Sequence, residues 1–217
     1  MPEVTELQTR RPRGRPSAGA RDAIVASALD LLNTDGLAQL TTREVARRAG
    51  VSEASVFYHF GDKIGLLHQA MLTGLEPLKA IDPDVLAGDV ERPLAETLAE
   101  IATGLEAFFD RAMPVLSTVQ ADADLRAAFA QRLIRGDNGP HRGVQLLDKH
   151  LTGMKQRGQV DAGADGQAAA LMLVGACFLR SWQRHLAGQQ RKPTLPDLAE
   201  TVDALARFLE PHRVASR

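Results

Sequence analysis

Apolar residues recur along this chain at helical spacing, with Ala and Leu prominent among them. Val, Ile and Thr nowhere alternate with polar residues over the length of a strand. The pattern therefore predicts an all-α protein of about nine helices. Besides two short helices within 41–60, helices are expected over residues 20–35, 62–80, 91–110, 113–134, 138–157, 164–187 and 195–210.

Glycine and proline separate these segments. Gly36 is expected to end the first helix, and loops are expected at 82–88, 136–140, 158–166 and 189–196. Pro114 lies in an otherwise helical stretch, where a proline removes a backbone donor. We therefore expect Pro114 to start or kink a helix.

The segment 41–63 carries signals for two short helices joined by a tight turn. Thr41 can cap the first helix, and Glu44 can reach back to the amide of Thr41, which is the capping-box pattern. Gly50 suits the left-handed residue that ends a helix, and Ser52 can cap the next one. This layout is typical of a helix-turn-helix, although each signal alone would also fit a generic helical hairpin.

The second of these helices has distinct faces. At about 100° per residue, Val56, Phe57 and Phe60 point to one side, as core residues would. The residues expected to point the other way are Ala54, Ser55, Tyr58 and His59. Gly61 is expected to stop the helix, and Asp62 can cap the following one.

Taken together, these signals resemble the DNA-binding domain of the TetR family of bacterial transcriptional regulators. The match covers roughly residues 20–68 and is carried by Ile24, Ala28, Leu32, Gly36, Leu40, Thr41, Val45, Ala46, Ala49, Gly50, Val51, Ser52, Phe60, Lys63, Leu66 and Leu67. The resemblance implies an arm over 1–18, a three-helix DNA-binding domain over 19–66, an effector-binding and dimerisation domain over 67–212, and a tail over 213–217. It also implies a dimeric repressor that binds a palindromic operator and is released by a small effector.

The positive charge of the chain is local rather than global. The formal net charge is −1, so the chain is not a generally basic nucleic-acid binder. Arginines gather instead in the N-terminal arm and at 43–48. The arm sequence Pro-Arg-Gly-Arg-Pro resembles an AT-hook, in which Arg13 and Arg15 would enter the minor groove of A·T-rich DNA. A basic tail that merely adds charge is the alternative.

The resemblance assigns roles to residues of the segment 42–63, which we call the reading head. Arg43 matches a position that can reach a base edge, where its fork suits guanine, and a phosphate contact is the alternative. Thr42, Ser55 and Lys63 match positions that hold phosphates. Tyr58 and His59 are expected near phosphate or groove edge.

Two residues depart from the usual family pattern. Phe57 replaces a tyrosine, and its helical position points to the core whereas the resemblance places it at the DNA. Glu53 would lie beside DNA, where it could accept from cytosine N4 or simply stabilise the positive helix N-terminus. Both alternatives stay open for each residue.

The C-terminal two thirds resembles the family in layout. The last two long helices are expected to dimerise, because an apolar helix must bury each apolar face. The expected interface residues are Leu171, Val174, Phe178, Leu198, Val202, Leu205 and Leu209. Large side chains that could line an apolar pocket for a hydrophobic effector are Phe108, Phe109, Met113, Leu147, His150 and Trp182.

Other function classes lack support in the sequence. No motif of a metalloprotease, P-loop, Rossmann fold or nucleophile elbow occurs, so neither an enzyme nor a cofactor or metal site is expected. Single Cys177 fits a reducing cytoplasm. The first residues are polar, and the apolar run 168–179 is too short to span a membrane. An effector-independent or architectural DNA-binding protein remains the alternative to a ligand-responsive repressor.

Overall fold

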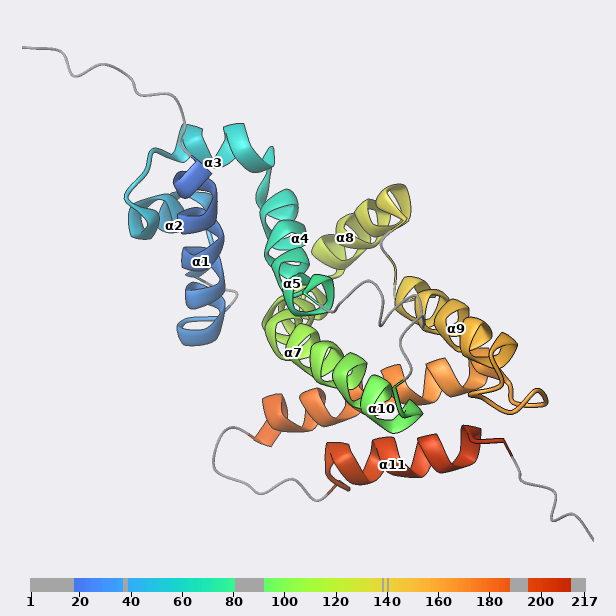
Figure 1. The fold of residues 1–217 in the computed structure, drawn as a ribbon. Coiled ribbons are helices and arrows are strands. Elements are labelled where there is room, and N and C mark those ends of the chain that lie inside the picture. The colour runs from blue at the N-terminus through green and yellow to red at the C-terminus, as the bar shows by residue number, and fades with distance from the viewer. Residues whose placement is uncertain are drawn as a thin grey trace, which may run out of the picture.

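The computed structural model describes residues 18–36, 39–80, 92–137, 139, 141–187 and 195–211. All regular structure within these ranges is helical, which confirms the all-α prediction (Figure 1). The predicted arm lies outside the described residues except for its last position, so Arg13 and Arg15 keep their predicted roles as predictions. The predicted tail lies outside them as well.

The N-terminal part consists of α1 (Ala18–Thr34), α2 (Thr42–Ala49), α3 (Glu53–Phe60), α4 (Lys63–Thr73) and the single turn α5 (Glu76–Lys79). Side-chain caps begin three of these helices, as the sequence indicates. Thr41 accepts from the amide of Glu44 at 3.1 Å, Ser52 from that of Ser55 at 3.2 Å and Asp62 from that of Gly65 at 2.6 Å. Gly50 ends α2 with φ 67°, the left-handed conformation that glycine adopts without strain. The helix expected over 62–80 is interrupted after Thr73.

The second half of the predicted capping box is wrong. The amide of Thr41 donates to the carbonyl of Gln39 rather than to Glu44. The Glu44 carboxylate instead accepts hydrogen bonds from Arg47 and Arg48, one helical turn further along. Two guanidinium groups on the same face attract the carboxylate more strongly than one neutral amide does.

The rest of the chain forms α7 (Leu94–Gln120), α8 (Ala123–Gly136), α9 (His141–Gln156), α10 (Gly166–Ala187) and α11 (Leu198–Leu209). The expected helix boundary between 110 and 113 is wrong, because α7 continues through Pro114. Neighbouring Ala112, Met113 and Val115 are each at most 1% exposed. Burial of these side chains outweighs the unfavourable proline, which costs a helix interior about 3 kcal/mol. The chain turns instead at Asp122, which caps α8 through the amide of Leu125.

The long helix α7 joins two hydrophobic cores. Its N-terminal half packs with α9, α10 and α11, and its C-terminal half packs with α1 to α4 and with Phe129 of α8. Figure 1 shows α10 and α11 side by side at the foot of the molecule, with α7 rising from them toward α4. The predicted domain boundary between 66 and 67 falls inside α4.

Candidate nucleic-acid interface

Helices α2 and α3 present a short polar surface because their apolar residues are buried. Val45 and Val56 are at most 1% exposed and fix the two helices against the N-terminal core. On the opposite side of α3, Ala54 is exposed and Tyr58 is 74% exposed, as predicted. These side chains are therefore open to an approaching partner.

Phe57 lies at the surface of α3. It is 48% exposed, so the helical-wheel prediction that it points into the core is wrong. Only Val56 and Phe60, four positions apart, are buried in this two-turn helix. Phe57 lies about 100° around the helix from Val56, which leaves it at the edge of the core. This exposure is compatible with the placement that the family resemblance implied, and the contact of Phe57 with DNA stays a prediction.

His59 departs from its expected outward position. It is only partly exposed, and its Nε2 is buried without a hydrogen-bond partner. Its ring lies edge-on to Tyr58 with centroids 5.2 Å apart and 6.0 Å from the ring of Phe60. The ring fills the space between an exposed and a buried aromatic side chain, so one edge faces the protein.

Glu53 and Thr42 form a contact that neither sequence-based interpretation of Glu53 anticipated. The Thr42 hydroxyl donates to Glu53 Oε1 at 2.6 Å, which joins the first residue of α2 to the first residue of α3. Both residues are partly exposed. The pair is eleven positions apart in sequence, so no local signal could have revealed it.

The arginines of α2 differ in their surroundings. Arg47 binds Glu44. Arg48 binds Glu44 as well as Asp30 of α1 and Asp35, which directly follows α1. The hydrogen bonds from Arg47 and then Arg48 lower the pKa of Glu44 from 4.5 to about 2. Arg43, by contrast, is exposed and pairs with none of the acidic residues that the structure describes.

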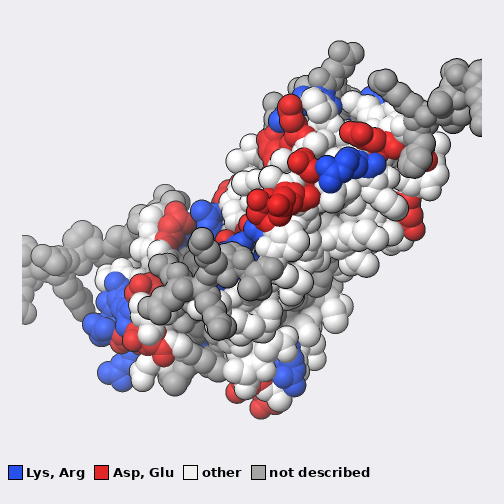
Figure 2. All heavy atoms as spheres, turned by 90° about the horizontal axis from the view of Figure 1, so that it is seen from below, with Lys and Arg blue, Asp and Glu red and all other residues white. Residues whose placement is uncertain are grey.

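Figure 2 shows the same mixture of charge on one face of the molecule. Basic and acidic atoms interleave at the end that carries α1 and α2, and acidic atoms form a band nearer the middle. The predicted basic patch at 43–48 is therefore less positive than its sequence indicates, since acids of α1 and α2 neutralise part of it.

Ser55 and Lys63 lie at the starts of α3 and α4. Each is partly exposed, and the amide of Ser55 is already bound by Ser52. Burial lowers the pKa of Lys63, while the nearby Asp122 opposes that shift. Their predicted phosphate contacts stay predictions.

The predicted dimer residues divide into two groups. Val202, Leu205 and Leu209 are at most 8% exposed, so they are already covered within the protomer, and their place in a dimer interface stays a prediction. They form the single apolar face of α11, which packs into the core of its own protomer. Val174 and Leu198 are partly buried against the same core, whereas Leu171 is 61% exposed and Phe178 40%.

Four large exposed apolar residues of α10 and α11 were not among the predicted interface residues. They are Met172, Leu179 and Leu186 of α10 and Phe208 of α11. Met172 and Phe208 also line a shallow apolar groove of about 390 Å³ between the two helices, together with Leu173, Ala176, Thr201, Ala204 and Leu205. A helical wheel of 166–187 could have grouped Met172, Leu179 and Leu186 away from the buried Leu173 and Cys177.

The residues predicted for effector binding do not form one open site. Met113, Leu147 and His150 are at most 5% exposed, and Phe108, Phe109 and Trp182 are partly buried. Phe109 stacks edge-on with Phe178 of α10, with ring centroids 5.4 Å apart. Leu147, Phe108 and Phe109 lie in or against the two hydrophobic cores, and the role of all six residues in effector binding stays a prediction.

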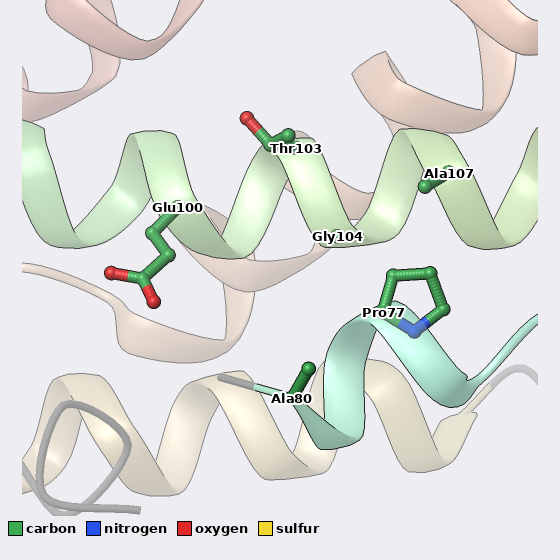
Figure 3. A pocket seen from close by; sticks show the side chains of 6 residues that line it. All are labelled: Pro77, Ala80, Glu100, Thr103, Gly104 and Ala107. Carbon is green, nitrogen blue, oxygen red and sulfur yellow. The ribbon is translucent and has the colours of Figure 1, made fainter. Parts of the chain in front are cut away.

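A groove of about 340 Å³ lies elsewhere, between α5 and α7 (Figure 3). Its lining residues are Pro77, Ala80, Glu100, Thr103, Gly104 and Ala107, and none of them was predicted. In Figure 3 the Glu100 side chain extends from α7 toward the side occupied by α5, and Pro77 faces the Gly104–Ala107 turn. Glu100 is held by Arg92 at 2.7 Å.

No helix in the described part of the chain is both long and apolar enough to cross a membrane. Within the same ranges, no three His, Cys, Asp or Glu side chains gather as metal ligands would.

Comparisons with known proteins agree with this geometry. Residues 24–70, which include α2 and α3, match the family model described as "Bacterial regulatory proteins, tetR family". The chain is 45% identical over 56 residues to the tetracycline repressor protein class C of Escherichia coli, covering 24% of this chain and 26% of that protein. It is 33% identical over 118 residues to the HTH-type transcriptional regulator EthR of Mycolicibacterium smegmatis, covering 49% and 50%. The chain thus spans about a quarter to a half of the length of these relatives.

The overall fold also has solved counterparts. The fatty acid degradation regulator FadR of Bacillus halodurans superposes with a TM-score of 0.61 at 17% identity, covering 95% of this chain and 100% of that one. A likeness at this identity concerns the fold alone. Together with the family match over the helix-turn-helix, it extends the agreement from α2 and α3 to the arrangement of the C-terminal helices. Residues 24–70 of the chain are thus similar to the TetR family of bacterial regulatory proteins, and the chain as a whole shares the fold of a solved regulator.

Proposed function

We propose that this protein is a DNA-binding transcriptional repressor that acts as a homodimer on a palindromic operator and is released by a small hydrophobic effector. The observation that carries the proposal is the reading head. Helix α3 exposes Ala54, Phe57 and Tyr58, and Arg43 of α2 is exposed without an acidic partner among the described residues. A helix with exposed side chains on one face and an unpaired arginine beside it can enter the major groove of DNA and contact base edges there.

Backbone amides support the same proposal. The caps at Thr41 and Ser52 each take the third amide of their helix. The earlier amides of α2 and α3 point out of the helix ends, where they can bind phosphate oxygens. Such contacts position a protein on DNA, while side chains at the base edges select sequence.

Homodimerisation is supported by the exposed apolar face of α10. Leu171, Met172 and Leu179 are each at least 50% exposed on a helix whose opposite face is buried. A two-fold dimer would place two reading heads in successive major grooves, about 34 Å apart, and would require a palindromic site.

The groove between α5 and α7 supports the effector part of the proposal. A mostly apolar groove with one carboxylate, between α5 and α7, is a place where a small molecule could contact the helix that joins both cores. The tight burial of Met113, Leu147 and His150 favours a second candidate function, an effector-independent DNA-binding protein. The two candidates differ in whether any compound changes operator binding.

Binding to the DNA upstream of its own gene tests the proposal. We expect a protected palindrome in a footprint, and loss of protection when hydrophobic compounds that act as effectors are added. Arg43→Ala should weaken operator binding by about 1–3 kcal/mol and relax selectivity at one base pair. Arg111→Ala, on the exposed surface of α7, is the matched control and should leave binding unchanged. Equal effects of the two substitutions would contradict the reading head proposed here.

A further inference from the structure

Within the described residues, the hydrogen bond between Thr42 and Glu53 is the only one that joins a side chain of α2 to a side chain of α3. At 2.6 Å it has the length of a charge-assisted bond from a hydroxyl to a carboxylate. It holds an acidic side chain at the reading head, next in sequence to the exposed Ala54. A carboxylate at that place repels the phosphates of DNA, so the fixed position of Glu53 needs an explanation.

Helix capping does not explain the position of the Glu53 carboxylate. The start of α2 is capped by Thr41 and the start of α3 by Ser52. The Glu53 carboxylate therefore is not required as a cap, and one of its oxygens is engaged by Thr42 instead. A hydroxyl has a single proton to donate, so Thr42 cannot donate to a phosphate while it donates to Glu53.

We propose that Thr42 is a positioning residue that holds the Glu53 carboxylate toward a base edge, and that Glu53 selects cytosine through its N4 amino group. The inference rests on the proposed DNA-binding function. A carboxylate can only accept hydrogen bonds, and the cytosine edge in the major groove offers the N4 donor. Guanine presents acceptors at N7 and O6, which an ionised carboxylate repels. Oε1 is held by Thr42, which leaves Oε2 to accept from the base.

Fixing the side chain is what makes the selection effective. A glutamate has three rotatable bonds, and ordering a long side chain costs about 1–2 kcal/mol of entropy. In the free protein Thr42 already restricts Glu53 to one orientation, so less of that cost falls on DNA binding. Loss of the hydroxyl should therefore reduce selectivity at the base that Glu53 reads and leave the other positions of the operator unchanged.

Selection from randomised double-stranded DNA, followed by affinity measurements on single-position operator variants, tests the inference. Wild type is compared with Thr42→Val, which removes the hydroxyl at constant shape, with Thr42→Ser, which keeps it, and with Glu53→Gln. We expect wild type to require cytosine at one position of each half-site. Thr42→Val should lower that preference by about 5- to 100-fold at this position alone, and Thr42→Ser should restore it. Glu53→Gln should shift the preference toward adenine, whose N6 and N7 suit an amide.

Three outcomes would overturn the inference. In the first, Thr42→Val weakens all operator variants equally, as loss of a phosphate contact would. In the second, Glu53→Gln leaves the selected sequence unchanged. In the third, wild type selects no sequence at all, and then the proposed DNA-binding function fails with it. Thermal unfolding of each variant separates these results from loss of the fold.

Discussion

Glu44 determines which positive charges of α2 remain available to DNA. Its carboxylate accepts from Arg47 Nε at 2.7 Å and from Arg48 Nε at 3.2 Å. Arg48 also reaches Asp30 at 2.8 Å and so ties α2 to the end of α1. The cluster serves the packing of the helix-turn-helix, because its arginines are occupied by acids of the protein. Arg43 is left as the arginine of α2 that can face a base.

The Glu44 cluster predicts a dependence of stability on pH. Its pKa in the folded protein is about 2, whereas the ordinary value is 4.5. A carboxyl whose pKa is lower in the folded state stabilises that state fully above its unfolded pKa and loses the contribution as pH falls toward the folded pKa. We expect the free energy of unfolding of wild type and Glu44→Gln, measured with urea, to converge between pH 4.5 and about 2. A difference that stays constant across this window would contradict the expectation.

At the scale of helices, features set by neighbouring residues could be predicted and features set by distant residues could not. The starts of α2, α3 and α4 follow from caps at Thr41, Ser52 and Asp62, each within three residues of its partner amide. The continuation of α7 through Pro114 depends on burial against other helices, which no local pattern reports. The Thr42–Glu53 bond likewise requires that α2 and α3 already be packed.

The burial of α11 shows the same limit. Its apolar stripe was clear in the sequence, but a stripe does not say whether its partner is the same protomer or a second one. The stripe packs against α7 and α10 of its own protomer. The predicted effector residues meet the same limit, because large apolar side chains can line a core or a pocket equally well.

The junction of α3 and α4 depends on the absence of a side chain at Gly65. A Cβ built there would lie 2.0 Å from the carbonyl oxygen of Phe60, which is backbone and cannot turn away. Gly65→Ala should therefore force the two helices apart and lower the free energy of unfolding by about 1–3 kcal/mol.

Gly143→Ala in α9 is the matched control, because a Cβ there meets nothing within 4 Å. The control should raise stability by about 0.5–1 kcal/mol, as alanine does in a helix interior, and thermal or urea unfolding measures both. Equal effects would show that α3 and α4 are not in such close contact.

At the scale of the whole molecule, the exposed apolar surface lies on α10 and α11, whereas α7 is the helix that connects the two hydrophobic cores. The exposed apolar residues of α10 and Phe208 of α11 lie at one end of the molecule, while α2 and α3 lie at the other (Figure 1). Helix α7 contacts both ends through its two cores. A dimer formed at α10 would therefore fix the distance between two reading heads through α7 and α4. Any ligand that moved α7 would change that distance and shift the population that fits an operator.

The dimer prediction can be tested without DNA. Leu171 and Leu179 are 61% and 50% exposed on the same side of α10, two helical turns apart. Glutamate at either position costs little in a monomer, but in a two-fold interface each substitution buries two carboxylates. At about 1–3 kcal/mol for each buried polar group, the dimer Kd should rise by at least about 30-fold. Sedimentation velocity over a range of protein concentrations measures this shift.

Leu146→Glu in α9, at a residue 66% exposed, is the matched control and should leave the dimer intact. If Leu146→Glu rather than Leu171→Glu dissociates the dimer, the interface lies on α9, and the spacing of the operator half-sites must be derived from a different axis.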